Sequence, residues 1–163
     1  MKLNPFEAKL FLELMLPLHW YVNQQAKVLP KIQSFSAYED CSLEDKLMIR
    51  DYLFTHPELI IQYVQDNPNR LDAEALNIIS SWKNFIYQDF FVERLLKKHS
   101  ILIDDQENVY AALGITDSLN DLMDKRDLPV RVQAVLLPFQ GKVIYDGFLR
   151  WYRVYFGGGI KSS

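Results

Sequence analysis

Residues 132–147 read VQAVLLPFQGKVIYDG, and this stretch decides the fold class of the chain. Two apolar runs rich in β-branched residues are separated by Gln140-Gly141 and followed by Asp146-Gly147. Such runs, bounded by glycine-containing turns, are typical of consecutive antiparallel strands. We therefore expect strands over 132–139, 142–145 and 149–156. The first of them is apolar on both faces over 132–137, which predicts an interior position in the sheet.

The β pattern extends toward the middle of the chain. Residues 100–103 and 109–113 are apolar and flank the polar loop 104–108, which predicts a hairpin. Residues 85–98 fit a helix or a strand, because their apolar positions match both periods. We favour a strand over 90–96 because aromatic and β-branched residues are enriched there.

The first 88 residues show helical spacing instead. Ser42 and Thr55 each precede an acidic residue by three positions, a pattern that resembles a capping box and predicts the start of a helix. Asp72 is a third helix-start signal. We expect one helix over 43–54, one that Asn67-Pro68 ends, and one that follows Asp72. A further short helix should start at residue 116 or 117 and run to residue 123.

A longer helix should precede these. Pro17 should bend or interrupt it. Glu13 breaks its most apolar part, which is also too short to cross a bilayer, so we expect no membrane segment. Its core-facing stripe, at spacings of three and four, comprises Phe6, Leu10, Leu14, Leu18 and Tyr21.

Together these patterns predict an α+β fold, with N-terminal helices packed on a C-terminal antiparallel sheet or small open barrel. We expect a helical region over 1–88 and a β-rich region over 89–163, in one compact domain with a shared core. The chain has 163 residues, 49% hydrophobic content and a net charge of −3, which argues against disorder. Residues 1–127 carry 13 basic and 20 acidic side chains (−7), and residues 128–163 carry 5 and 1 (+4).

The titratable residues indicate no metal site or cofactor. Cys41 is the single cysteine and cannot form an internal disulfide, which fits a reducing, cytoplasmic location. His19, His56 and His99 are not at metal-ligand spacing from one another. His19 lies in an apolar helix and should be a core or boundary residue. We therefore expect no metal ion and no cofactor.

One stretch near the C-terminus interleaves basic and aromatic side chains. On a strand, Trp151, Arg153 and Tyr155 share one face, and Arg150 lies on the other with Tyr152. Guanidinium groups beside aromatic rings suit single-stranded nucleic acid, because the cations meet phosphates and the rings stack on bases. An ordinary strand with one buried face would have the same pattern. The candidate nucleic-acid-binding residues are Arg150, Trp151, Arg153 and Tyr155.

The sequence contains no recognisable catalytic motif, and we assign no catalytic residue. The leading hypothesis is a non-enzymatic protein-interaction or regulatory module, with a protein partner that the sequence does not identify and a homo-oligomer left open. One alternative is the nucleic-acid-binding module just described. Another is a small hydrolase in which carboxylates such as Asp89, Asp104 and Asp146 meet in space.

A resemblance adds one expectation. The segments around Ser81-Trp82-Lys83, 97–103 and 109–114, together with 136–147 (LLPFQGKVIYDG), resemble a group of uncharacterised bacterial proteins. The resemblance covers roughly residues 55–160. It implies a bacterial cytosolic protein with helices ahead of a β region, and it carries no activity and no functional residue.

Overall fold

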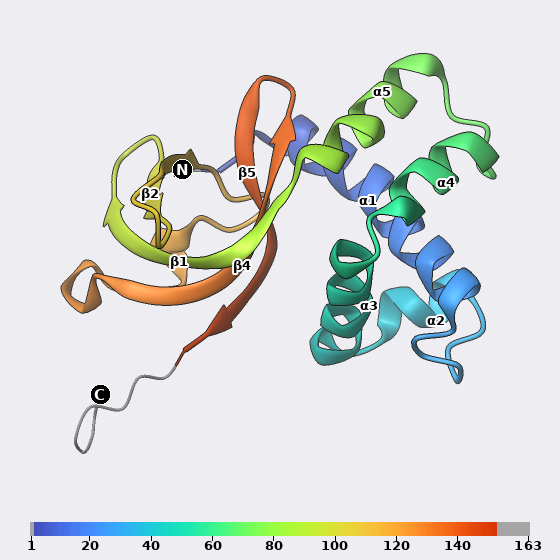
Figure 1. The fold of residues 1–163 in the computed structure, drawn as a ribbon, viewed down its shortest axis with the longest axis horizontal. Coiled ribbons are helices and arrows are strands. Elements are labelled where there is room, and N and C mark those ends of the chain that lie inside the picture. Colours follow the sequence, from blue (N-terminus) through green and yellow to red (C-terminus); the bar gives the residue numbers. More distant parts are fainter. Residues whose placement is uncertain (1, 153–163) are drawn as a thin grey trace. The chain divides into compact units, whose positions relative to one another are not determined.

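The computed structural model of this chain describes residues 2–152 (Figure 1). It has the α+β class that the sequence predicts, with the α-helices first and a five-stranded antiparallel sheet after them. The sheet is open and has the strand order β3-β2-β1-β4-β5. Contacts divide the described chain into two compact units. We call residues 4–85 with 138–141 the helical unit, and residues 2–3, 86–137 and 142–152 the β unit.

The helical unit is built around its first and longest helix, α1. The ring of Phe11 in α1 packs against the rings of Trp82 and Phe139, at centroid distances of 5.4 Å and 5.6 Å. Helix α1 contacts α2, α3, α4 and α5 (Figure 1). The helices of this unit are α1 (Pro5–Ala26), α2 (Phe35–Asp40), α3 (Leu43–Thr55), α4 (Glu58–Asp66) and α5 (Ala73–Ser81).

Pro17 does not interrupt α1, which was one of its two predicted effects, because packing against four other helices outweighs the one backbone hydrogen bond that a proline cannot donate. The expected core position of Phe6 is wrong. Phe6 is 86% exposed and does not belong to the core. Ala8 and Phe11 set the buried face at this end, and Phe6 lies about 200° around the helix from Ala8.

Side-chain caps confirm two of the predicted helix starts. The Ser42 hydroxyl accepts the amide hydrogen of Asp45 at 3.1 Å, where α3 begins. The Asp72 carboxylate accepts that of Ala75 at 2.9 Å, where α5 begins. Each cap satisfies a donor that the first helical turn leaves without a partner inside the helix.

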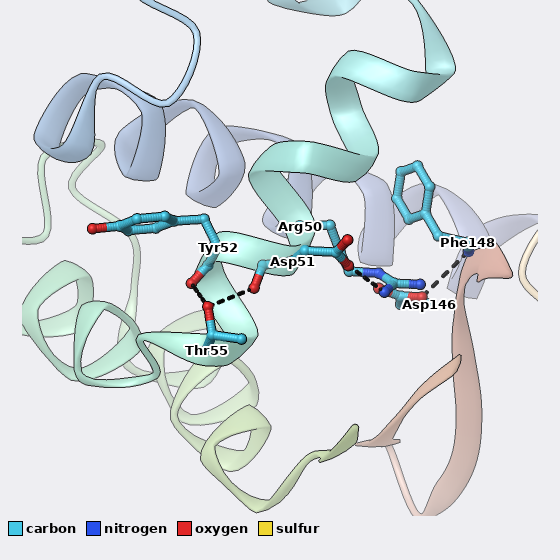
Figure 2. A network of polar contacts seen from close by, with 6 residues as sticks. All are labelled: Arg50, Asp51, Tyr52, Thr55, Asp146 and Phe148. Carbon is cyan, nitrogen blue, oxygen red and sulfur yellow. Dashed lines mark hydrogen bonds and ion pairs between the residues drawn. The ribbon is translucent and has the colours of Figure 1, made fainter. Parts of the chain in front are cut away.

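The predicted helix start at Thr55 is wrong. Thr55 is the last residue of α3, and its hydroxyl donates to the carbonyl oxygens of Asp51 (2.9 Å) and Tyr52 (3.1 Å), as Figure 2 shows. Helix α4 begins after Pro57 and has no side-chain cap. The hydroxyl is therefore occupied by the preceding helix and does not cap the next one.

His19 is a core residue, as the sequence predicts, and is 1% exposed. Its Nδ1 atom lies 2.9 Å from the Tyr38 hydroxyl, between α1 and α2. Burial, and then the positive charges of Arg50 and Lys46, lower the pKa of His19 to about 3. The imidazole is therefore neutral at physiological pH.

The first strand of the β unit lies in residues 85–98, whose sequence fits either a helix or a strand. Residues 86–95 are a strand, so it starts four residues before the predicted position at 90. The predicted hairpin over 100–113 is confirmed, and β4 lies between β1 and β5, as its apolar sequence indicates. The strands are β1 (Ile86–Leu95), β2 (Ser100–Ile103), β3 (Val109–Ala112), β4 (Val130–Phe139) and β5 (Lys142–Trp151).

The turn expected at Asp146-Gly147 is wrong, because β5 runs through it without interruption. Gly147 has φ +94°, and the Asp146 carboxylate accepts the amide hydrogen of Phe148 at 3.2 Å. A glycine with positive φ can occur inside a strand as a local backbone irregularity of the kind found in β-bulges, so the strand need not end there. The predicted strand over 149–156 thus joins β5 up to Trp151, and residues 153–156 lie outside the described part of the chain.

One face of the sheet carries the core of the β unit. Its fully buried members alternate along β1 and β4, and include Phe90, Val92, Val132 and Ala134. The segment after β3 lies at the rim of this core, where the Leu113 amide donates to Val143 of β5 at 3.0 Å. The helix expected over 116–123 is instead a single 3₁₀ turn, Leu119–Asp121, which Ser118 caps.

Candidate functional site

The opposite face of the sheet exposes large side chains. Along β1, Phe90 and Val92 are 1% and 0% exposed, whereas Phe91 between them is 39% exposed. Successive side chains of a strand point to opposite faces, so Phe91 lies on the face away from the β-unit core. This aromatic side chain stands on β1, the middle strand of the five.

The register of the sheet places Phe91 in a row of exposed or half-buried side chains. Phe91 is opposite Ile103 of β2 and Arg131 of β4, and Ile103 is opposite Val109 of β3. Residues that pair directly in an antiparallel sheet share a face. We call Val109, Ile103, Phe91 and Arg131 the exposed row. Its outermost member, Val109, is 63% exposed.

A polar cluster closes one end of the exposed row. The Arg131 guanidinium donates to the Asp89 carboxylate at 2.7 Å, and the Tyr152 hydroxyl donates to the same carboxylate at 2.6 Å. Arg131 also lies over the Tyr152 ring, 4.8 Å from its centroid, a geometry that favours cation–π attraction. The charge of Arg131 is therefore balanced by a carboxylate and shared with an aromatic ring.

These contacts perturb both titratable partners of Asp89. The hydrogen bond to Asp89 is the main cause that raises the pKa of Tyr152, followed by burial and the negative charge of Asp89. The hydrogen bond from Arg131 to Asp89 raises the pKa of the guanidinium. Tyr152 therefore remains a neutral hydrogen-bond donor, and Arg131 remains a cation, throughout the physiological range.

Two of the four predicted nucleic-acid-binding residues fall within the described chain. Arg150 is exposed and Trp151 is 43% exposed, at the end of β5. Arg153 and Tyr155 lie outside the described residues. Sequence reasoning selected Asp89 as a carboxylate and placed Tyr152 in the basic aromatic stretch, but it did not connect them to Arg131. Only the strand register brings these three residues together.

The three carboxylates considered for a hydrolase have separate sets of donors. Asp89 accepts from Arg131 and Tyr152. Asp146 accepts the amide hydrogen of Phe148. Asp104 lies in the loop of the β2–β3 hairpin and accepts from several groups of that loop. These hydrogen bonds support structural roles for Asp89 between two strands and for Asp104 in a loop.

Asp104 organises the hairpin loop. One of its oxygens accepts the amide hydrogens of Gln106 and Asn108, both at 2.9 Å. The other accepts from the side chains of Gln88 (2.9 Å), Asn108 (3.0 Å) and Tyr110 (3.4 Å). Burial acts to raise the pKa of Asp104, but the hydrogen bonds from Asn108, Gln106 and Gln88 outweigh it and hold the pKa below its ordinary value.

Among residues 2–152, no three His, Cys, Asp or Glu side chains gather in a way that could hold a metal ion. No helix in this range is both long enough and apolar enough to cross a membrane.

Comparison with known proteins adds no functional assignment. No family model, no curated protein and no solved structure matches this chain. The resemblance to a bacterial group therefore stays a prediction.

Proposed function

We propose that this chain is a non-enzymatic protein-interaction module, and that it binds its partner through the exposed row. The observation that carries the proposal is the 39% exposure of Phe91 on the middle strand, in register with Arg131. Aromatic and arginine side chains are the residue types most enriched at the energetic centres of protein interfaces. Val109 and Ile103 extend the apolar area on one side of Phe91.

The charge of the β unit also supports a protein partner. Residues 2–3, 86–137 and 142–152 contain 9 Lys and Arg and 10 Asp and Glu, so their net charge is −1. Arg131, the cation of the exposed row, is paired with Asp89. A polyanion requires excess positive charge, whereas a mixed apolar and charge-balanced face suits the surface of another protein.

The test compares two phenylalanine variants that carry the same chemical change. Phe91→Ser alters the exposed row, and Phe6→Ser alters a phenylalanine of the helical unit that is 86% exposed. In affinity capture followed by mass spectrometry, wild type and Phe6→Ser should retain one shared partner, and Phe91→Ser should lose it. Identical capture by all three proteins would contradict the proposal.

The same variants test a homo-oligomer. Light scattering coupled to size exclusion should show a mass that depends on concentration if the partner is a second copy of the chain. Phe91→Ser should then abolish the dependence. The proposal includes a bacterial cytoplasmic location, and the single free Cys41 supports the reducing compartment that this location implies.

A single-stranded nucleic-acid-binding function is the second candidate, and the exposure of Trp151 beside Arg150 favours it. A fluorescent oligonucleotide should then bind with an affinity that falls steeply as salt increases. Trp151→Ala should weaken binding by about 1–3 kcal/mol, the contribution of one base–ring stack. Arg150→Ala should also weaken binding. Arg126→Ala is its matched control and should not, because Arg126 is exposed and paired with Asp124. Absence of binding at low salt would exclude this candidate.

A further inference from the structure

The helical unit contains a pocket of about 500 Å³ that the sequence patterns did not indicate. Four aromatic residues from three helices line it. Trp20 and Tyr21 come from α1, Phe35 from α2 and Tyr63 from α4. The volume lies in the range of small-ligand sites, about 300–1,000 Å³, and is large enough for one side chain with its adjoining backbone.

Neighbouring aromatic rings pack against the aromatic residues that line the pocket. The rings of Tyr21 and Tyr63 meet edge to face at a centroid distance of 5.0 Å. Tyr38, which is 0% exposed, packs near both Trp20 (6.5 Å) and Phe35 (6.0 Å). Their orientations are thus set before any ligand arrives, which reduces the entropy lost on binding.

Hydrogen bonds fix the two tyrosines further. The Tyr21 hydroxyl donates to the carboxylate of Asp66 at 2.6 Å, and the Tyr63 hydroxyl accepts from the side-chain amide of Asn69 at 3.0 Å. Both phenol groups therefore have polar partners. Tyr21 and Tyr63 are only 5% and 1% exposed, so they form the base of the pocket, and the half-buried Trp20 and Phe35 are its more accessible rings.

The charge around the pocket is negative. Glu13 lines it, and among the residues described as lining it none is a Lys, Arg or His. Lys9 lies 3.7 Å from Glu13, but both side chains are more than half exposed, and such a pair contributes little. The helical unit as a whole carries 7 Lys and Arg and 11 Asp and Glu, a net charge of −4.

We propose that this pocket binds the alkylammonium group of a lysine side chain presented by a partner protein. The negative faces of aromatic rings attract a cation, and the attraction is strongest when the cation is desolvated. Glu13, whose side chain is 59% exposed, adds a negative charge at the same site that solvent partly screens. Trimethylated lysine should bind more tightly than unmodified lysine, because its methyl groups pack on the rings and its charge is less hydrated.

The first test compares short peptides that differ only in the central side chain. Titrations followed by ¹⁵N NMR should show binding of lysine and trimethyl-lysine peptides, with shifts at the Trp20 indole. A peptide with a neutral isostere, in which carbon replaces the ammonium nitrogen, should bind at least about tenfold more weakly. Equal binding of the isostere would overturn the proposal, as would absence of binding by any lysine peptide.

Two variants localise the site. Trp20→Ala should weaken binding of the trimethyl-lysine peptide about tenfold, and Glu13→Gln about threefold. Glu44→Gln is the matched control, since Glu44 is an exposed acidic residue of the helical unit that does not line the pocket. If Trp20→Ala fails to fold, Glu13→Gln against Glu44→Gln decides. Equal affinities of these two variants would overturn the proposal.

A third arm distinguishes the source of the cation. Tetramethylammonium chloride is titrated into the same protein, with sodium chloride as the ionic-strength control. Binding of tetramethylammonium without binding of the peptides would assign the pocket to a small-molecule cation and overturn the protein source. The pocket and the exposed row belong to different units, so Phe91→Ser should leave peptide binding unchanged and the two proposals fail separately.

Discussion

The hydroxyl of Tyr152 donates a 2.6 Å hydrogen bond to the carboxylate of Asp89, which lies 63 residues earlier in the chain. Arg131 shares that carboxylate at 2.7 Å, and its guanidinium lies over the Tyr152 ring. The contact therefore connects β1, β4 and the residue that follows β5. At this end of the exposed row, the polar groups of the three residues are joined by hydrogen bonds.

Removal of the charge of Asp89 should lower the pKa of Tyr152, because the hydrogen bond to that carboxylate is the main cause that raises it. The measurement is a pH titration of ¹³C-labelled tyrosine in Asp89→Asn and wild type. The variant should also lose about 1 kcal/mol or less of unfolding free energy, since the pair is partly exposed. Asp127→Asn, at an exposed site of the β unit, should leave Tyr152 unchanged. An unaltered titration of Tyr152 in Asp89→Asn would contradict the proposed contact.

Asp104 should contribute stability that depends on pH. Its folded-state pKa lies below the ordinary value of about 3.9, so the contribution is present above that pH and is lost as pH falls through the folded-state pKa. Asp104→Asn should lower the melting temperature at pH 7, and the difference from wild type should shrink below about pH 4. Asp105→Asn, at the exposed next position, should have a much smaller effect. A difference that is constant from pH 7 to pH 3 would exclude this role.

His19 should make the protein less stable as the pH falls. Its pKa is lowered from 6.5 to about 3, so between these values the unfolded chain binds a proton that the folded chain does not. Unfolding free energy should therefore decrease by up to about 1.4 kcal/mol per pH unit from this group alone. Urea denaturation from pH 7 to pH 4 should show a shallower slope for His19→Gln. Tyr38→Phe retains the buried imidazole and should retain the slope. Equal slopes for His19→Gln and wild type would refute the assignment.

The helix starts provide a matched comparison. Asp72→Ala should cost about 1 kcal/mol of unfolding free energy, because it leaves the amide of Ala75 without its cap. Thr55→Ala should cost less, since the Thr55 hydroxyl donates to two carbonyl oxygens at the end of α3 and caps no helix. Chemical denaturation of the two variants measures the difference. A cost at Thr55 equal to or larger than that at Asp72 would contradict this prediction.

Local chemistry explains why much of the fold could be predicted. The hairpin around residues 104–108, the turn at Gln140-Gly141 and the caps at Ser42 and Asp72 each depend on residues close together in the sequence. Predictions failed where contacts with residues distant in the sequence overrode the local sequence pattern. Asp146-Gly147 resembles a turn, but the pairing of β5 in the sheet keeps the strand continuous through it. Packing against the other helices likewise explains why Pro17 does not interrupt α1, although the local signal allowed an interruption.

The sequence by itself determined the α+β class and the interior position of β4, because the spacing of apolar residues follows the period of each element. It also indicated that His19 is a core or boundary residue, since apolar neighbours surround it along its helix, and the structure shows that it is buried. Only the tertiary structure decided the exposed row, the contact of Asp89 with Arg131 and Tyr152, and the aromatic pocket. These sites join residues that are distant along the chain, and strand register and helix packing, to which the whole chain contributes, bring them together.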